Sequence, residues 1–248
     1  MRCIITLHDP TDFLDIPGTD WTHTNGNPRV FIETKKIWEN VKDDETFSIF
    51  FWKQDPGLKD GEYTICRSSR TIRVGSQFIG NYWQDELKTV QALLSVIEKN
   101  FNYDYILWTQ LGTYWILPKL RKFLEERHHE YTGVVNTQFP EVRYTSGAAS
   151  IYSRSTVKLI VSHEGKFTDH KSHTREFSDD VYMGYFLNKR GVYPVPQCWY
   201  RWLESGELNI EHILEHDDRN DILMYRVKSM WARHFDPIIL GKIYKYYN

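Results

Sequence analysis

The chain has 248 residues, of which 41% are hydrophobic, and a formal net charge of -2. This length suffices for a full hydrophobic core, the near-neutral charge argues against a nucleic-acid partner, and the apolar runs are too short to span a bilayer. The N-terminus shows no signal-peptide pattern. Three scattered cysteines, Cys3, Cys66 and Cys198, fit reduced thiols better than disulfides or a metal site. We therefore expect a soluble, cytoplasmic protein without a membrane-inserted segment.

The first hundred residues alternate predicted strands with predicted helices. Turn-forming residues predict a long loop from about residue 8 to residue 30. The clearest helix begins near Asp85, its expected cap, because apolar residues recur at helical spacing from Leu87 to Ile97. This alternation indicates a parallel sheet with helices on its faces. The predicted strands here are residues 2–7, 47–52 and 71–74, and the predicted helices are residues 34–40 and 85–99.

The stretch from Tyr103 to Trp108 is aromatic and apolar and contains neither Gly nor Pro. Such a composition is typical of a strand that is covered on both faces, and the helix before it favours a parallel arrangement. Open parallel sheets bind ligands beyond the carboxyl ends of their strands. We therefore expect a ligand site around Thr109, Gln110 and Gly112.

The second half of the chain continues the mixed pattern. The small residues from Ser146 to Tyr152 fit either a strand or a turn, and Ser153 or Ser155 is the expected cap of the next helix. A further helix begins at Asp179, because its start is acidic and a glycine follows its basic end. The predicted helices are residues 118–126, 156–163, 179–190 and 238–247, the predicted strands are residues 133–136 and 224–228, and residues 164–176 are a predicted loop.

Three sequence blocks follow one another in order between residues 70 and 195. Residues 78–89 (FIGNYWQDELKT) lead into YDYILWT at 103–109, residues 144–148 are YTSGA, and residues 178–184 are SDDVYMG. The ordered set resembles the nucleotide-sugar glycosyltransferases of GT-A fold, in particular the inverting Fringe and β-1,3-galactosyltransferase-like group. That group carries D-x-Y-x-N-L-T-L-K-T and Y-x-x-K-T-D-D-D, then Y-x-S-G, then E-D-V-x-x-G. The resemblance implies an α/β fold with a Rossmann-like, mixed, mostly parallel sheet flanked by helices.

The chain departs from this group at the expected metal site. The metal-binding carboxylates of the group would fall at residues 110–112, which are Gln, Leu and Gly, and the His of its H-Y-R-V-K segment would fall at Met224. None of these side chains is a hard anionic oxygen ligand or an imidazole for a divalent cation at a diphosphate. We therefore predict a site without metal or other cofactor, in which Arg226 and Lys228 meet the diphosphate charge. We assign no metal to His170, His173, His212 or His216.

The resemblance assigns roles to further residues. Asp180 is the expected catalytic base, since inverting transfer needs a carboxylate to take the proton of the attacking hydroxyl. The plainer alternative is that Asp179 and Asp180 only complement a helix N-terminus. Gly147 and Ala148 are expected near the acceptor or else form a tight turn, and Lys88 either reaches the donor or is solvated on its helix. Asp179 and Trp115 are also expected at the acceptor, although the Trp115 ring could instead pack in the core. The other expected donor contacts are Thr109, Gln110, Gly112, Arg226 and Lys228.

We interpret the chain as one glycosyltransferase domain over residues 1–248. Residues 1–112 are its expected nucleotide-sugar-binding half, and residues 113–248 its expected acceptor-binding and catalytic half. The leading prediction is inverting transfer of a hexosyl or pentosyl group from a UDP-linked donor to a glycan hydroxyl. Golgi members of the group carry a membrane anchor. In lacking one, the chain resembles the soluble glycosyltransferases of large algal viruses more closely, and this resemblance implies a location in the host cytoplasm.

Two other functions compete with this prediction. The first is a glycan- or nucleotide-binding protein on a decayed glycosyltransferase scaffold, which the missing carboxylates suggest and which turnover of the donor would exclude. The second is a nucleotidyltransferase that acts on sugar phosphates. It is disfavoured because residues 3–12 contain no glycine-rich phosphate loop.

Overall fold

The computed structural model describes residues 1–10, 29–75, 82–126, 128–137, 142–162, 179–196, 199–204, 209–218, 220–228 and 233–248. Residues 82–88, 179 and 196 are described through their backbone alone. The strands are β1 (Cys3–His8), β2 (Phe47–Asp55), β3 (Tyr63–Cys66), β4 (Thr71–Gly75), β5 (Tyr105–Gln110), β6 (Thr113–Trp115), β7 (Tyr131–Thr137), β8 (Arg143–Ser153), β9 (Val195–Pro196), β10 (Tyr200–Leu203) and β11 (Met224–Val227). The helices are α1 (Arg29–Asn40), α2 (Tyr82–Asn100), α3 (Leu117–Glu126), α4 (Arg154–Val161), α5 (Asp179–Asn188), α6 (Glu211–Asp218), the 3-10 helix η4 (Arg233–Phe235) and α7 (Asp236–Tyr247). Among the described residues, no helix combines the length and the apolar character that a membrane crossing requires.

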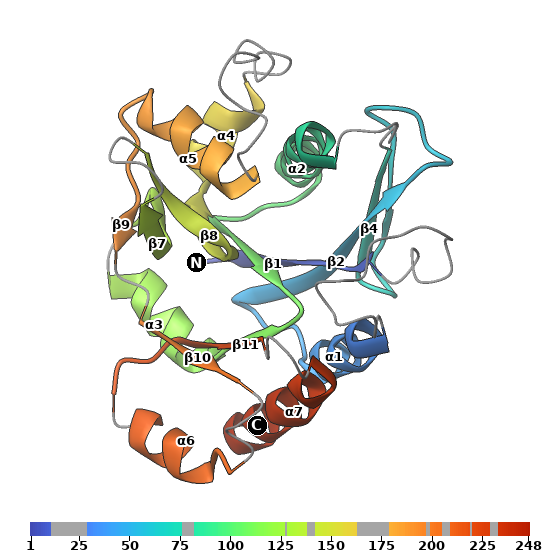
Figure 1. Cartoon of the computed structure of the whole chain (residues 1–248). Helices are drawn as coiled ribbons and strands as arrows, with labels where there is room; N and C mark the ends of the chain where they lie inside the picture. The colour runs from blue at the N-terminus through green and yellow to red at the C-terminus, as the bar shows by residue number, and fades with distance from the viewer. Residues whose placement is uncertain are drawn as a thin grey trace. The chain divides into compact units, whose positions relative to one another are not determined.

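An eight-stranded sheet has the strand order β3-β4-β2-β1-β5-β8-β7-β9 (Figure 1). β2 lies parallel to β4, and β7 lies parallel to β9, whereas β3 and β8 run antiparallel to their neighbours. Neighbouring strands in this order are mostly not consecutive in the chain, so crossover connections join them, as in α/β proteins. The structure therefore confirms the predicted α/β class with a mixed, mostly parallel sheet.

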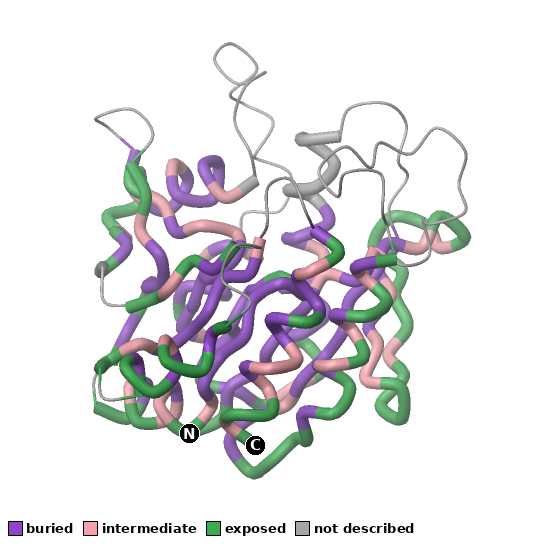
Figure 2. Tube along the Cα trace, turned by 60° about the horizontal axis from the view of Figure 1, so that its bottom comes forward, coloured by how far each residue is buried: buried purple, intermediate pink, exposed green. Residues whose placement is uncertain are grey.

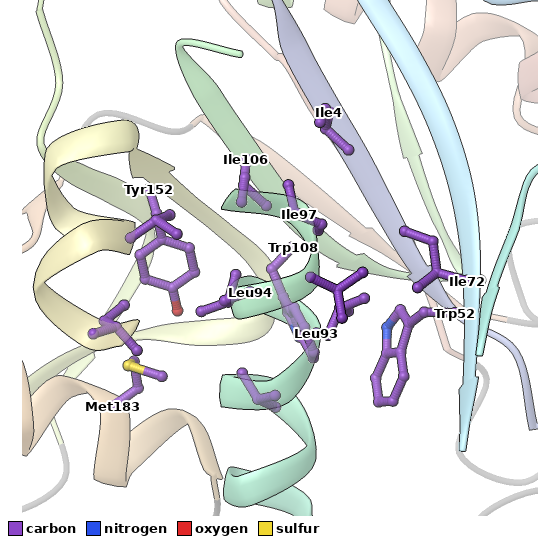
Figure 3. Close-up of a cluster of buried hydrophobic side chains, with 14 of the residues drawn as sticks. Ile4, Trp52, Ile72, Leu93, Leu94, Ile97, Ile106, Trp108, Tyr152 and Met183 are labelled. Atoms are coloured by element: carbon purple, nitrogen blue, oxygen red, sulfur yellow. The ribbon is translucent and has the colours of Figure 1, made fainter. Parts of the chain in front are cut away.

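Helices α2, α4 and α5 cover one face of this sheet (Figure 1). The apolar stripe that the sequence predicts on α2 is buried against the sheet, and Leu94 and Ile97 are among its members. The rings of Trp52 on β2 and Trp108 on β5 lie 5.1 Å apart in the same cluster (Figure 3). Buried residues follow the central strands β1, β2 and β5 (Figure 2). The core thus fixes β5, and with it the strand end at Thr109.

A second, three-stranded sheet has the order β10-β11-β6. β11 lies parallel to β10 and antiparallel to β6. The indole N–H of Trp38 on α1 donates to the carbonyl oxygens of Leu111 and Thr113, at 3.2 and 3.1 Å. The hydroxyls of Tyr225 on β11 and Tyr247 on α7 lie 3.1 Å apart. Aromatic side chains with polar ends therefore hold α1 and α7 to this small sheet.

The chain divides into two compact units, each built from three separate segments. Unit 1 comprises Met1–Leu7, Asp44–Thr109 and His128–Gln197, and it contains nearly all of the eight-stranded sheet with α2, α4 and α5. Unit 2 comprises His8–Asp43, Gln110–Arg127 and Cys198–Asn248, and it contains the three-stranded sheet with α1, α3, α6 and α7. The functional halves at residues 1–112 and 113–248 stay a prediction.

The structure changes several details of the predicted elements. α1 begins at Arg29 rather than at residue 34, and α2 begins at Tyr82, so Asp85 lies inside that helix instead of capping it. Residues 146–152, for which the sequence allowed either a strand or a turn, belong to strand β8. Ser153 is the cap of α4, since its hydroxyl oxygen accepts the backbone N–H of Thr156 at 3.2 Å. The short strands β3, β6, β9 and β10 had no clear sequence signal. The predicted loop at residues 164–176, with His170 and His173, and most of the predicted loop at residues 8–30 lie outside the described residues.

Candidate functional site

Asp180, the expected base, lies in the first turn of α5, and this helix packs against β8. The Asp180 carboxylate accepts the backbone N–H of Gly147 on β8 at 3.2 Å and that of Val181 at 2.9 Å. The side chain is half-buried, and a helix N-terminus stabilises negative charge. The structure therefore brings Asp180 and Gly147 together and holds a carboxylate oxygen in a defined place.

The close packing of α5 on β8 depends on Gly184, one turn beyond Asp180 on the helix. A Cβ atom at Gly184 would lie 2.3 Å from the Cβ of Tyr144 and 2.8 Å from the carbonyl oxygen of Arg143. Separations this short do not occur between real atoms, so a larger residue would force the helix away from the strand. Gly184 thus determines how near Asp180 approaches β8.

The charge of Asp180 affects the pKa values of two tyrosines of unit 1. Burial and the Asp180 carboxylate raise the pKa of Tyr131 to about 12, against hydrogen bonds from Thr145 that lower it. The same two causes raise the pKa of Tyr144. The Tyr131 hydroxyl oxygen accepts both the backbone N–H and the hydroxyl of Thr145, each at 2.9 Å. Both phenols stay neutral near pH 7, and we call Asp180, Gly147, Tyr131 and Tyr144 the carboxylate cluster.

Arg226 lies on β11 in unit 2 with only 7% of its surface exposed. Its guanidinium donates to the hydroxyl of Thr113 at 3.3 Å and to the amide oxygen of Gln110 at 2.5 Å. Both acceptors are neutral. Burial and the nearby charge of Arg233 lower the pKa of Arg226 to about 10, although the Asp236 carboxylate acts against them, so the side chain is still a cation at neutral pH. A buried cation with neutral partners is costly unless an anion joins it.

Lys228 and Arg233 add to this charge. Burial, Arg226 and Arg233 lower the pKa of Lys228, and the carboxylate of Asp236 acts against them. That carboxylate also accepts the Nε–H of Arg233 at 2.5 Å. We call Arg226, Lys228, Arg233 and Asp236 the basic cluster. Its described members are three cations and one carboxylate, so it carries an excess of positive charge.

Arg233 and Asp236 are the members of the basic cluster that were not predicted from the sequence. The cation of this pair is Arg233. It lies in η4, a short 3-10 helix without a periodic pattern, and it is buried. The available signal was its spacing from Asp236, since residues three apart at a helix start can form an ion pair. Arg226 and Lys228 share one charged environment, and their predicted contact with a diphosphate stays a prediction.

The strand end at residues 110–112 does not fit a divalent cation. The amide oxygen of Gln110 already accepts a hydrogen bond from Arg226, and Leu111 is buried and apolar. A Cβ atom at Gly112 would lie 3.0 Å from Nη1 of Arg226, so a guanidinium fills the space beside this residue. A fixed positive charge repels a metal cation placed there. Across the described residues, no three His, Cys, Asp or Glu side chains are grouped as metal ligands.

The other predicted site residues have different surroundings. Thr109 is fully buried, and its hydroxyl donates to the carbonyl oxygen of Ala148 at 2.7 Å, so both residues help to join β5 to β8. Trp115 is also fully buried, and its ring has no exposed face for a sugar. Its predicted acceptor contact is therefore wrong in this structure, and core packing explains it instead. Lys88 lies on α2 and Asp179 begins α5, but both side chains lie outside the described part of the chain.

Comparison with known proteins finds similarity only among solved structures. No family model matches the sequence, and no curated protein matches it. A glycosyltransferase involved in glycosylation of the major capsid of PBCV-1 is 9% identical, with a TM-score of 0.48 over 97% of this chain and 100% of that chain. The galactosyltransferase LgtC, solved with donor and acceptor sugar analogs, is 10% identical, with a TM-score of 0.48 over 98% and 96%. Mouse xyloside xylosyltransferase 1 is 10% identical, with a TM-score of 0.44 over 91% and 96%.

Proposed function

We propose that this protein is an inverting glycosyltransferase that transfers a sugar from a UDP-linked donor to a glycan hydroxyl without a bound metal. The observation that carries the proposal is the basic cluster. Arg226 is a buried cation whose described hydrogen-bond partners, Gln110 and Thr113, are neutral. A diphosphate supplies the missing negative charge and accepts charge-assisted hydrogen bonds from a guanidinium. The three ordered sequence blocks supply the class of reaction.

In the proposed reaction, the two clusters have separate tasks. The oxygen of the acceptor hydroxyl attacks the anomeric carbon of the donor and forms the new glycosidic bond. Its proton passes to the Asp180 carboxylate, and the bond between the anomeric carbon and the diphosphate oxygen breaks. The electron pair of that bond leaves with UDP, whose growing charge the basic cluster stabilises. Inversion at the anomeric carbon follows from a single displacement.

Calorimetric titration with UDP and with uridine tests the donor site in the absence of added metal. We expect UDP to bind with clearly higher affinity than uridine, because the diphosphate makes the charge-assisted contacts. Release of UDP from UDP-linked sugars, measured with and without a panel of oligosaccharides, then distinguishes an enzyme from a protein that only binds. UDP binding without any release would favour the decayed-scaffold alternative. An NMR measurement of the anomeric configuration of the product tests inversion.

A further inference from the structure

Two large aromatic side chains of β10 are exposed although they belong to a sheet. Trp202 has 44% of its surface exposed, and Tyr200 has 42%. Single exposed aromatic residues are common on protein surfaces. Here, however, the two residues occupy alternate positions of one strand, so their side chains point to the same face of the sheet, about 6.6 Å apart along it. They form one surface, which we call the aromatic platform.

The register of the small sheet places this platform on the same face as Arg226. Trp202 lies opposite Arg226 on β11, and Arg226 lies opposite Thr113 on β6. Residues opposite one another in register project to one face, and the hydrogen bond from Arg226 to Thr113 agrees with this. The platform therefore adjoins the side chain that we assign to the donor diphosphate.

The opposite face of the sheet is closed. Arg201, the residue between the two platform members, forms two hydrogen bonds of 2.5 Å with the carboxylate of Asp217 on α6. Tyr225 contacts Tyr247 on α7 through its hydroxyl. Helices thus cover one face of β10 and β11, and the aromatic platform belongs to the other.

We propose that the aromatic platform of Tyr200 and Trp202 binds an oligosaccharide, which, given the proposed function, is the acceptor glycan. A sugar ring has a face of C–H groups that packs on an aromatic ring, while its hydroxyls stay in water. Small ligands such as nucleotides are usually enclosed in concave pockets that bury most of their surface. An exposed strand at one end of the sheet order offers no such enclosure, but it suits a chain ligand that keeps one side in solvent. The two residues stand about 6.6 Å apart along the strand, a spacing that suits contact with successive sugar units.

Glycan binding by matched variants tests this site independently of catalysis. A printed array of oligosaccharides is probed with the wild type, Trp202→Leu, Tyr200→Ala and Tyr246→Ala. Tyr246 is the control, because it is a tyrosine of unit 2 with 41% of its surface exposed, but it lies on α7. We expect the two platform variants to lose roughly tenfold or more in affinity, the scale of a lost stacking contact. The control should bind as the wild type does.

Several outcomes would overturn the inference. The inference would be wrong if both platform variants bound glycans with wild-type affinity. It would also be wrong if the wild type bound UDP but no glycan. An equal loss in Tyr246→Ala would show a general effect of removing surface tyrosines. A tenfold loss of UDP affinity in Trp202→Leu, with glycan binding intact, would assign the ring to the nucleobase instead. If the wild type neither bound UDP nor turned over a donor, but the glycan results were as expected, the proposed function would be rejected. The inference of a glycan-binding site would still hold.

Discussion

The carboxylate cluster and the basic cluster are built in opposite ways. Around Asp180, backbone N–H groups of Gly147 and Val181 meet the carboxylate, and the polar groups are matched. Around Arg226, neutral acceptors meet a buried cation, and Lys228 and Arg233 add like charge. A matched site holds its group in one position with little dependence on a ligand. At an unmatched site, the buried charge destabilises the ligand-free protein, and an anionic ligand compensates that charge when it binds.

The largest effect is expected from Asp180→Asn, because the amide keeps the shape of the carboxylate but cannot take a proton. Transfer should fall by at least about a hundredfold, while UDP affinity and folding stay as in the wild type. Steady-state kinetics and calorimetry measure the two properties. Asp179→Asn is the matched control and should show a smaller loss. Near wild-type turnover in Asp180→Asn would remove this residue from the reaction.

Arg226→Met should separate affinity from stability. UDP affinity is expected to fall by about 10-fold to 100-fold, since charge-assisted hydrogen bonds contribute about 1.5–3 kcal/mol. The free energy of unfolding without ligand should stay the same or rise, because a buried cation is replaced by an apolar side chain of similar length. Titration calorimetry and urea denaturation measure these quantities.

Arg201→Met is the control for that experiment, since Arg201 hydrogen-bonds a carboxylate, whereas the described hydrogen-bond partners of Arg226 are neutral. Its removal leaves the Asp217 carboxylate buried without its guanidinium, so stability should drop by about 1–3 kcal/mol. UDP affinity should change little. If Arg226→Met destabilised the protein as much as Arg201→Met, the charge imbalance of the basic cluster would be disproved.

Gly184→Ala tests how the carboxylate cluster is positioned. The added methyl would meet Tyr144 at 2.3 Å, so we expect a loss of about 1–3 kcal/mol in stability together with reduced transfer. Gly241→Ala on α7 is the matched helical control, because the atom nearest to its methyl would be Cδ1 of Ile37 at 3.9 Å. There the substitution should be neutral or stabilise by up to about 1 kcal/mol. Equal stability of the two variants in urea denaturation would contradict the tight contact.

The smallest effect is expected from removal of metal. Excess EDTA should change transfer by less than about twofold, since the guanidinium of Arg226 lies beside Gly112, one of the positions at which the resemblance would place the metal-binding carboxylates. Stimulation by manganese alone would not decide the question, because the donor diphosphate can carry a metal with it. Complete loss of transfer in EDTA, restored by manganese with saturation at micromolar concentrations, would show that a dedicated metal site exists.

Local patterns predicted the frame of this fold better than its site. The aromatic run of β5 and the apolar stripe of α2 are signals that depend on neighbouring residues only, and both elements form where they indicate. Burial depends on partners distant in sequence, which explains why Trp115 was taken for a sugar contact although its ring is fully buried. Arg233 was missed for the same reason: its importance comes from residues that the fold brings beside it.

The interleaving of the two units has a consequence for synthesis on the ribosome. All segments of unit 1 emerge before Cys198–Asn248, the segment that completes unit 2. At typical elongation rates of about 5–20 residues per second, several seconds pass before this last segment is available. During that time β6 lacks β11, the strand that it pairs with in the small sheet. A nascent chain stalled before β11 would therefore present an unpaired strand edge, to which another chain could pair.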